Sequence, residues 1–158
     1  MRQYGWIAVL ALVCDRFSKG WAKTWLRAQP GGTVPCWPGV LSWTYAENRG
    51  MAFSMLSGRR FFLIAVTSVV LIGLLLYLCR KPKASGGMQA LLWLLWGGAM
   101  GNLIDRVLWG YVVDFIEIRL FRFAIFNVAD SCVSVAAFLL AVMLLVQKEE
   151  KHGAGNPR

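Results

Sequence analysis

The chain has 158 residues, of which 58% are hydrophobic, and its mean hydropathy is +0.54. This composition is too apolar for an ordinary soluble domain and is typical of a small protein that crosses a membrane several times. The formal net charge is +9. It favours membrane lipids with anionic headgroups as partners over nucleic acid, because the basic residues are scattered around apolar stretches instead of forming one basic face.

The first predicted helix covers about residues 4–26. Its first half is apolar, and Asp15, Lys19 and Lys23 then follow at intervals of four, which places them on one helical face where Asp15 and Lys19 can form an ion pair. A cleaved secretory signal peptide is the alternative for this segment. No small-residue cleavage site follows the apolar stretch, so we expect a retained membrane helix.

A long segment, about residues 27–58, follows the first helix and is predicted to lie outside the membrane. Residues 30–32 and 35–39 are rich in Pro and Gly and predict turns. Residues 40–45 alternate, with Leu41, Trp43 and Tyr45 on one face, which predicts a strand. Such a strand could lie on the membrane surface or hold a lipidic ligand, and ordinary packing over the helix ends explains the pattern equally well.

Two further helices are predicted at about residues 59–79 and 88–105, joined by a short basic loop. The stretch 61–79 has no charged residue, and its 19 residues nearly span a hydrocarbon core of about 30 Å. The third helix ends with small residues at 97, 98, 99 and 101, which favour close helix contacts. Asn102 and Asp105 share a face beyond them, and the neighbouring Arg106 could stabilise a carboxylate or bind a phosphate.

A second outer segment, residues 106–126, precedes the fourth helix at about 127–147 and a polar tail at 148–158. Residues 115–123 alternate in part, which is a weaker strand pattern. The predicted fold is therefore a single all-α membrane domain, residues 1–158, with four transmembrane helices and a small β-like cradle. Four spans put both termini on one side. Charge does not decide which side, because the termini plus the middle loop carry seven Lys and Arg residues and the other two loops also carry seven.

Two aspartates, Asp114 and Asp130, lie in apolar surroundings near the predicted membrane edge. Placing a carboxylate in a bilayer costs about 2.5–3.5 kcal/mol even on a lenient scale, which favours a functional role for the pair. Two neighbouring carboxylates share a proton and can act as base and acid on a water molecule. The alternative is that each is a helix cap or a solvated loop residue, and Asn127 could likewise be a cap.

Other hydrolytic chemistry has few candidate residues. The four cysteines form no Cys-x-x-Cys pair, and the one histidine, His152, lies in the polar tail. This predicts neither a zinc site nor a nucleophile activated by histidine. We therefore expect aspartic chemistry without a metal or cofactor.

Five sequence blocks, in order, resemble the signature of bacterial lipoprotein signal peptidase (signal peptidase II). They are Asp15-x-x-Ser18-Lys19, Asn48-Arg49-Gly50-Met51-Ala52-Phe53, Gly97-Gly98-Ala99-x-Gly101-Asn102-x-x-Asp105-Arg106, Val113-Asp114-Phe115-Ile116 and Phe126-Asn127-x-Ala129-Asp130. Three positions depart from the family pattern, because Met51, Ala124 and Ala136 stand where Ala, Pro and Gly are usual. These departures bear on substrate preference and rate more than on reaction type.

The resemblance implies a four-helix aspartyl peptidase of the bacterial inner membrane, with both termini in the cytoplasm and the active site near the outer face. Its substrates would be prolipoproteins, cut before a cysteine that carries diacylglycerol, and we expect it to act as a monomer. Asp114 and Asp130 would be the catalytic pair. The residues implied to bind substrate or support the site are Asn48, Gly50, Asn102, Asp105, Arg106, Asn127, Ala129, Asp15 and Lys19.

Other functional classes would require different sequence features. A small transporter would use Asp15, Asp114 and Asp130 as proton or cation sites. A lipid phosphotransferase would need a compact carboxylate cluster for a metal, which Asp105 and Asp114 do not form in sequence. A structural protein would tolerate loss of both aspartates, and a presenilin-type protease would need a Gly-x-Gly-Asp string that is absent.

Overall fold

The computed structural model describes residues 3–50, 56–80, 84–121 and 123–153, with side chains of the last helix described up to Gln147. The departure at Met51 lies outside the described residues. Four helices and three strands account for most of the described residues, so the expectation of a mainly helical fold with a small β element is confirmed. The helices are α1 (Gly5–Thr24), α2 (Arg60–Cys79), α3 (Gly86–Leu108) and α4 (Val128–Gly153), and the strands are β1 (Thr33–Trp37), β2 (Leu41–Asn48) and β3 (Val112–Ile118).

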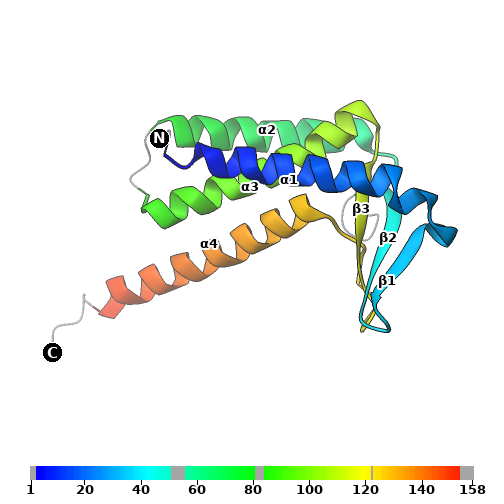
Figure 1. Cartoon of the computed structure of the whole chain (residues 1–158). Helices are drawn as coiled ribbons and strands as arrows, with labels where there is room; N and C mark the ends of the chain where they lie inside the picture. Colours follow the sequence, from blue (N-terminus) through cyan, green and yellow to red (C-terminus); the bar gives the residue numbers. More distant parts are fainter. Residues whose placement is uncertain (1–2, 51–55, 81–83, 122, 154–158) are drawn as a thin grey trace.

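Helix α3 is the central element and packs against each of the other three helices. The sheet lies at one end of the helices, while the start of α1 and the end of α4 lie at the other end (Figure 1). Two glycines allow the close approach. A Cβ atom at Gly97 would lie 2.7 Å from the carbonyl oxygen of Ala8, and one at Gly98 would lie 2.6 Å from that of Ala129. The predicted small-residue contact is therefore made with α1 and α4.

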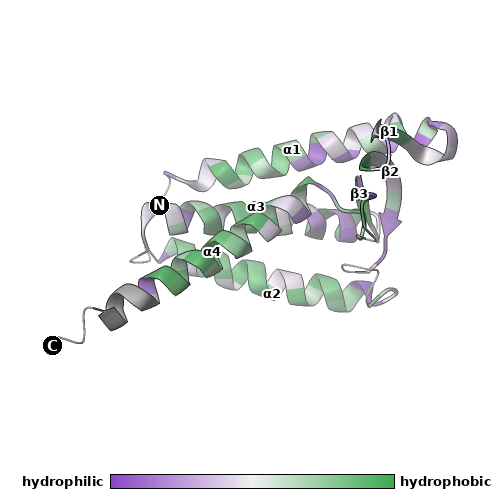
Figure 2. Ribbon diagram, turned by 90° about the horizontal axis from the view of Figure 1, so that it is seen from below, coloured by the Kyte–Doolittle hydropathy of each residue, from purple (hydrophilic) through white to green (hydrophobic). Residues whose placement is uncertain are grey.

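Apolar side chains cover the outside of the helices. Phe17 on α1 is 77% exposed and Phe61 on α2 is 82% exposed, with many other exposed apolar residues along the same helices. Figure 2 shows hydrophobic residues along all four helices and hydrophilic ones gathered on α1 and α3 toward the sheet. By length and composition, α2 and residues 128–147 of α4 could cross a membrane. Helix α1 carries four charged residues in its second half, and α3 is rich in Gly and Trp.

The three strands form one antiparallel sheet in the order β1-β2-β3. The predicted strand at 40–45 is confirmed as β2. The turn predicted at 35–39 is wrong in part, because Pro35 to Trp37 belong to β1. Proline is tolerated there because β1 is an edge strand and the missing N–H can face away from the sheet. Strand β3 starts at Val112, earlier than the alternating pattern indicated, because its first four residues are all buried.

A small apolar core holds the sheet against the end of α1. Its buried residues are Ala22, Leu26, Val113 and Phe115. The ring of Trp21 contacts those of Trp43 and Phe115 edge-on. Because α1 continues into a short 3₁₀ turn, η1 (Leu26–Ala28), the chain leaves the helix directly beside the sheet.

Helix α4 continues beyond its predicted end. Residues 148–153, which the sequence assigned to a polar tail, are helical up to Gly153. Lys and Glu have high helix propensity, which favours continuation of the helix through these residues. A second 3₁₀ turn, η2 (Pro30–Gly32), confirms the turn predicted there.

Candidate active site

The two candidate catalytic aspartates come from different elements that meet at the sheet end of the helices. Asp114 lies on β3 and is 2% exposed, and Asp130 lies in the first turn of α4. The segment before α4 runs beside β3. Two backbone hydrogen bonds, of 2.8 and 3.1 Å, join Phe126 in this segment to Ile116 on β3. This pairing brings the start of α4 beside Asp114.

Asn127 is the N-cap of α4 and also contacts the candidate site. Its Oδ1 accepts from the backbone N–H of Asp130 at 2.9 Å, while the carboxylate of Asp130 accepts from the Asn127 N–H at 3.3 Å. This reciprocal pair is a capping box. The side-chain amide of Asn127 in addition donates to Asp114 Oδ1 at 2.6 Å. The capping and active-site roles, which were alternatives in the sequence, are thus compatible in one residue.

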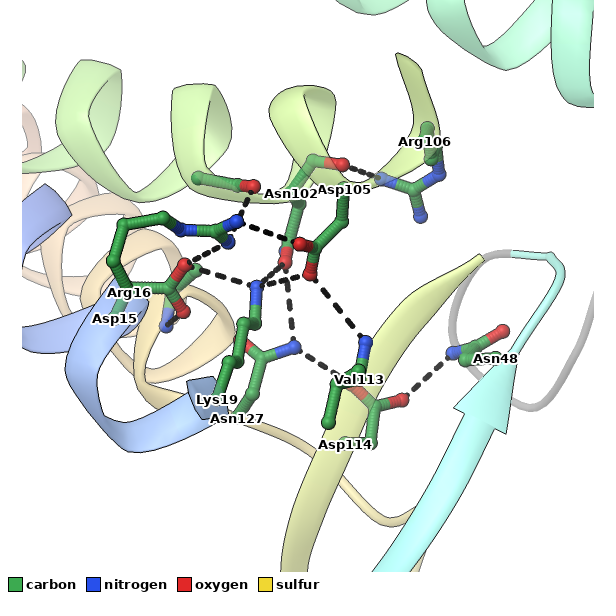
Figure 3. Close-up of polar contacts among 12 residues, drawn as sticks. Asp15, Arg16, Lys19, Asn48, Asn102, Asp105, Arg106, Val113, Asp114 and Asn127 are labelled. Carbon is green, nitrogen blue, oxygen red and sulfur yellow. Dashed lines mark hydrogen bonds and ion pairs between the residues drawn. The ribbon is translucent and has the colours of Figure 1, made fainter. Parts of the chain in front are cut away.

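Two further asparagines donate to the aspartates. Figure 3 shows the first of these bonds, from Asn48 to Asp114. Asn48 Nδ2 lies 3.0 Å from Asp114 Oδ2, and Asn102 Nδ2 lies 2.7 Å from Asp130 Oδ1. Sheet register explains the first contact: Asn48 pairs with Val112, two positions from Asp114, so both side chains lie on the same face. Each carboxylate is therefore held by amide donors from two elements.

Burial changes the acidity of Asp114. Loss of solvent, followed by the negative charge of Asp130, raises the pKa of Asp114 to about 7, against the opposing hydrogen bonds from Asn48 and Asn127. Asp114 can therefore hold a proton near neutral pH. This is the behaviour required of the acid in a pair of interacting carboxylates.

Arg106 holds the end of β2 beside the aspartates. Its Nη2 donates to the carbonyl of Gly50 at 2.8 Å, and the Gly50 N–H donates to Asn48 Oδ1 at 2.9 Å. The sequence indicated a carboxylate or phosphate partner for Arg106. Among the described residues the guanidinium donates to carbonyl groups, of Gly50 and more weakly of Asn102. Its charge also interacts with the carboxylates of Asp130 and Asp114.

A buried ionic cluster lies next to the aspartates and joins α1 to α3. Lys19 lies 3.0 Å from Asp15, as predicted, and also 3.0 Å from Asp105. Its ammonium group donates to Asn102 Oδ1 at 2.8 Å. Because an ammonium group can only donate, this contact fixes which end of the Asn102 amide faces Asp130. The cluster therefore extends to the candidate catalytic pair.

Every residue that the sequence assigned to the site is described, and hydrogen bonds and ion pairs connect them into one network at the sheet end. Ala129 joins it through its N–H, which donates to Asp15 Oδ1 at 3.2 Å. The sequence reasoning missed Arg16, which binds both Asp15 and Asp105. Its position beside Asp15 was a signal, but the helical spacing rule does not pair adjacent residues.

The structure describes the other two departures from the family pattern. Ala136 is fully buried in α4. Ala124 is partly buried in the irregular segment that leads to Asn127. Neither contacts the two aspartates through a hydrogen bond, because neither side chain has a polar atom.

Comparison with known proteins identifies the family. The model of a family described as Signal peptidase (SPase) II matches residues 7–146. A lipoprotein signal peptidase of Lactococcus lactis subsp. lactis (strain IL1403) is 39% identical over 145 residues, covering 92% of this chain and 95% of the relative. One of Streptococcus thermophilus (strain CNRZ 1066) is 38% identical over 149 residues, with the same coverage.

Solved structures agree with this result. A bacterial membrane enzyme determined by the in meso method at 2.3 Å resolution superimposes with a TM-score of 0.85 at 35% identity, over 92% of this chain and 88% of that one. A second, at 1.9 Å resolution, gives a TM-score of 0.78 at 35% identity, over 88% and 90% of the two chains. The chain therefore belongs to the signal peptidase II family of lipoprotein signal peptidases, which are aspartic-type proteases.

Proposed function

We propose that this chain removes signal peptides from prolipoproteins by cutting before the diacylglyceryl-modified cysteine, with Asp114 and Asp130 as the catalytic pair. One observation carries the assignment of the pair: a single amide, that of Asn127, binds Asp114 and caps the helix turn that carries Asp130. The two carboxyl groups, one on β3 and one on α4, are thereby held at one site.

The proposed reaction uses one shared proton. Burial raises the pKa of Asp114 to about 7, so we assign the proton to it. The ionised Asp130 takes a proton from water, which attacks the peptide carbonyl, while Asp114 donates its proton to the carbonyl oxygen. Collapse of the tetrahedral intermediate breaks the C–N bond: the proton taken up by Asp130 passes to the leaving amine, and a hydroxyl proton of the intermediate returns to Asp114 as the carbonyl re-forms.

The substrate is proposed to reach this site sideways from the bilayer. All four helices would span the inner membrane, with the sheet at the outer face and both termini in the cytoplasm. The support is the apolar outer surface of the helices and the position of the polar network at the sheet end (Figure 2). We propose a monomer whose partners are prolipoproteins and the surrounding membrane lipids.

The test is cleavage of a diacylglyceryl-modified prolipoprotein by the purified protein in lipid, with a chelator present. Asp114→Asn and Asp130→Asn should each lower kcat by about 10²–10⁴-fold, because each removes one proton-transfer group. Glu117→Gln is the matched control. Glu117 is a carboxylate on the same strand as Asp114, but it binds Thr44 and Arg119 instead of the proposed pair.

Cleavage before the lipidated cysteine that is lost in both asparagine variants and kept in Glu117→Gln supports the proposal. Full cleavage by either asparagine variant would contradict the assignment of the pair. Intact substrate with folded wild-type protein would contradict the proposed activity.

A further inference from the structure

Arg16 bridges two buried carboxylates beside the proposed catalytic pair. Its Nη1 donates to Asp105 Oδ1 at 2.7 Å, and its Nη2 donates to Asp15 Oδ2 at 2.6 Å and to the carbonyl of Gly101 at 2.9 Å. The Arg16 side chain is 30% exposed, whereas those of Asp15 and Asp105 are 0% and 1% exposed. The planar guanidinium fork suits two carboxylates at once, which a lysine ammonium group does not.

Each of these carboxylates also holds the backbone next to a proposed catalytic residue. Asp15 Oδ1 accepts from the N–H of Ala129 at 3.2 Å, and Asp105 Oδ2 accepts from the N–H of Val113 at 3.4 Å. Val113 and Ala129 are the residues directly before the two aspartates of the pair. The carboxylates bridged by Arg16 therefore fix both chain segments that carry the pair, and Figure 3 shows the links from α1 to α3 and on to Val113.

Arg16 also balances the charge of the cluster. Lys19 contacts both carboxylates at 3.0 Å, so two cations face two anions. Removing Arg16 would leave two almost fully buried carboxylates with one cation, and an uncompensated buried charge is costly. The excess negative charge would also lie close to the proposed pair, since Lys19 contacts Asn102, the donor to Asp130.

We propose that Arg16 is a positioning residue of this peptidase: by bridging Asp15 and Asp105 it fixes the separation of the two chain segments that carry the catalytic pair, and it keeps the adjoining cluster neutral. The proposal rests on the assignment of Asp114 and Asp130 under the proposed function. Arg16 does not reach the reacting atoms in this account and acts only through the two carboxylates.

Two kinetic changes are expected for Arg16→Met. Misplacement of the pair should lower kcat by about 100-fold while KM changes less than about threefold, because small errors in the position of reacting groups affect the chemical step. The net negative charge left in the cluster should disfavour ionisation of Asp114 and so move the alkaline limb of the pH profile to higher pH. A loss of folded protein alone would lower the rate without moving this limb.

The predicted pH dependence involves the charged and titratable groups that face this cluster, and these groups come from four elements. They are Asp15, Lys19 and Lys23 on α1, Asp105 and Arg106 on α3, Asp114 on β3, and Asp130 and Cys132 on α4.

The experiment compares kcat, KM and the pH profile of wild-type protein with Arg16→Met, Arg16→Gln and Arg16→Lys in lipid. Arg16→Gln keeps donor groups but removes the positive charge. The alkaline limb of its pH profile should therefore move to higher pH, as in Arg16→Met. Arg16→Lys should return the limb to the wild-type pH and recover part of kcat. The control is Arg27→Met, which removes one exposed positive charge near the same end of α1 and should leave both readouts unchanged.

An Arg16→Gln variant with wild-type kcat and an unmoved limb would overturn the proposal. If Arg16→Met does not fold, Arg16→Gln and Arg16→Lys decide by the position of the limb. Failure of the proposed function is distinguishable: folded wild-type protein would then leave the substrate intact, or Asp114→Asn and Asp130→Asn would still cleave it.

Discussion

Asn127 is the residue at which helix formation and the proposed chemistry meet. Its backbone and side chain form the capping box of α4 with Asp130, and the same side chain donates to Asp114 at 2.6 Å. The side-chain oxygen of Asn127 caps the helix, and the side-chain nitrogen donates to Asp114. These two contributions should therefore be separable by substitution.

We predict that Asn127→Ala destabilises the protein by about 1 kcal/mol through loss of the cap and also lowers kcat strongly. Asn127→Ser should keep most of the stability, since Ser is a good N-cap residue, but should lose activity because its hydroxyl does not reproduce the amide bond to Asp114. Thermal unfolding and cleavage assays on both variants check this. A Ser variant that is fully active would show that the contact to Asp114 is dispensable.

At the scale of elements, the site depends on how closely α4 approaches α3. A Cβ atom at Gly98 would lie 2.6 Å from the backbone oxygen of Ala129 and 3.0 Å from the Cβ of Cys132. Backbone cannot move aside as a flexible side chain can. Any side chain at position 98 must therefore displace the first turn of α4, which carries Asp130.

Gly98→Ala is accordingly predicted to destabilise the protein by about 1–3 kcal/mol and to reduce cleavage. The control is Gly73→Ala on α2, where an added Cβ meets nothing within 4 Å. That change should stabilise by roughly 0.5–1 kcal/mol, because Ala favours helix more than Gly does. Unfolding midpoints in detergent measure both effects, and equal midpoints for the two variants would refute the close contact.

The helices and β2 were predictable because each follows from a local pattern, such as the uncharged stretch at 61–79 or the alternation at 40–45. Strand β1 was not, because Pro35 and its neighbours have turn composition and only pairing with β2 makes them a strand. Arg16 was missed for a related reason: its partner Asp105 lies 89 residues away, and adjacency to Asp15 carries no helical pairing signal. Family motifs grouped the site residues, but which atoms meet depends on the three-dimensional fold.

For the whole molecule, the proposed topology places the sheet outside and the chain ends inside. Two exposed native cysteines lie on opposite ends: Cys36 is on β1, and Cys79 ends α2 away from the sheet (Figure 1). Single-cysteine variants that keep one or the other should differ in labelling by a membrane-impermeant thiol reagent on intact spheroplasts or protoplasts. We expect Cys36 to react and Cys79 to react only after lysis. The reverse pattern would contradict the proposed orientation.

The proposed catalytic pair also sets the response of the whole enzyme to pH. Activity requires one carboxyl group to be ionised and the other, Asp114, to be protonated. Activity should therefore rise with pH as the first group loses its proton, and fall as pH passes the pKa of Asp114, about 7.

The most direct measurement is the pH dependence of kcat/KM for cleavage of a lipidated prolipoprotein between pH 4 and 9, which reports the groups of the free enzyme. The shared-proton account predicts a bell-shaped profile whose alkaline limb lies near pH 7. A flat profile across this range, from protein shown to remain folded, would contradict a catalytic pair that shares one proton.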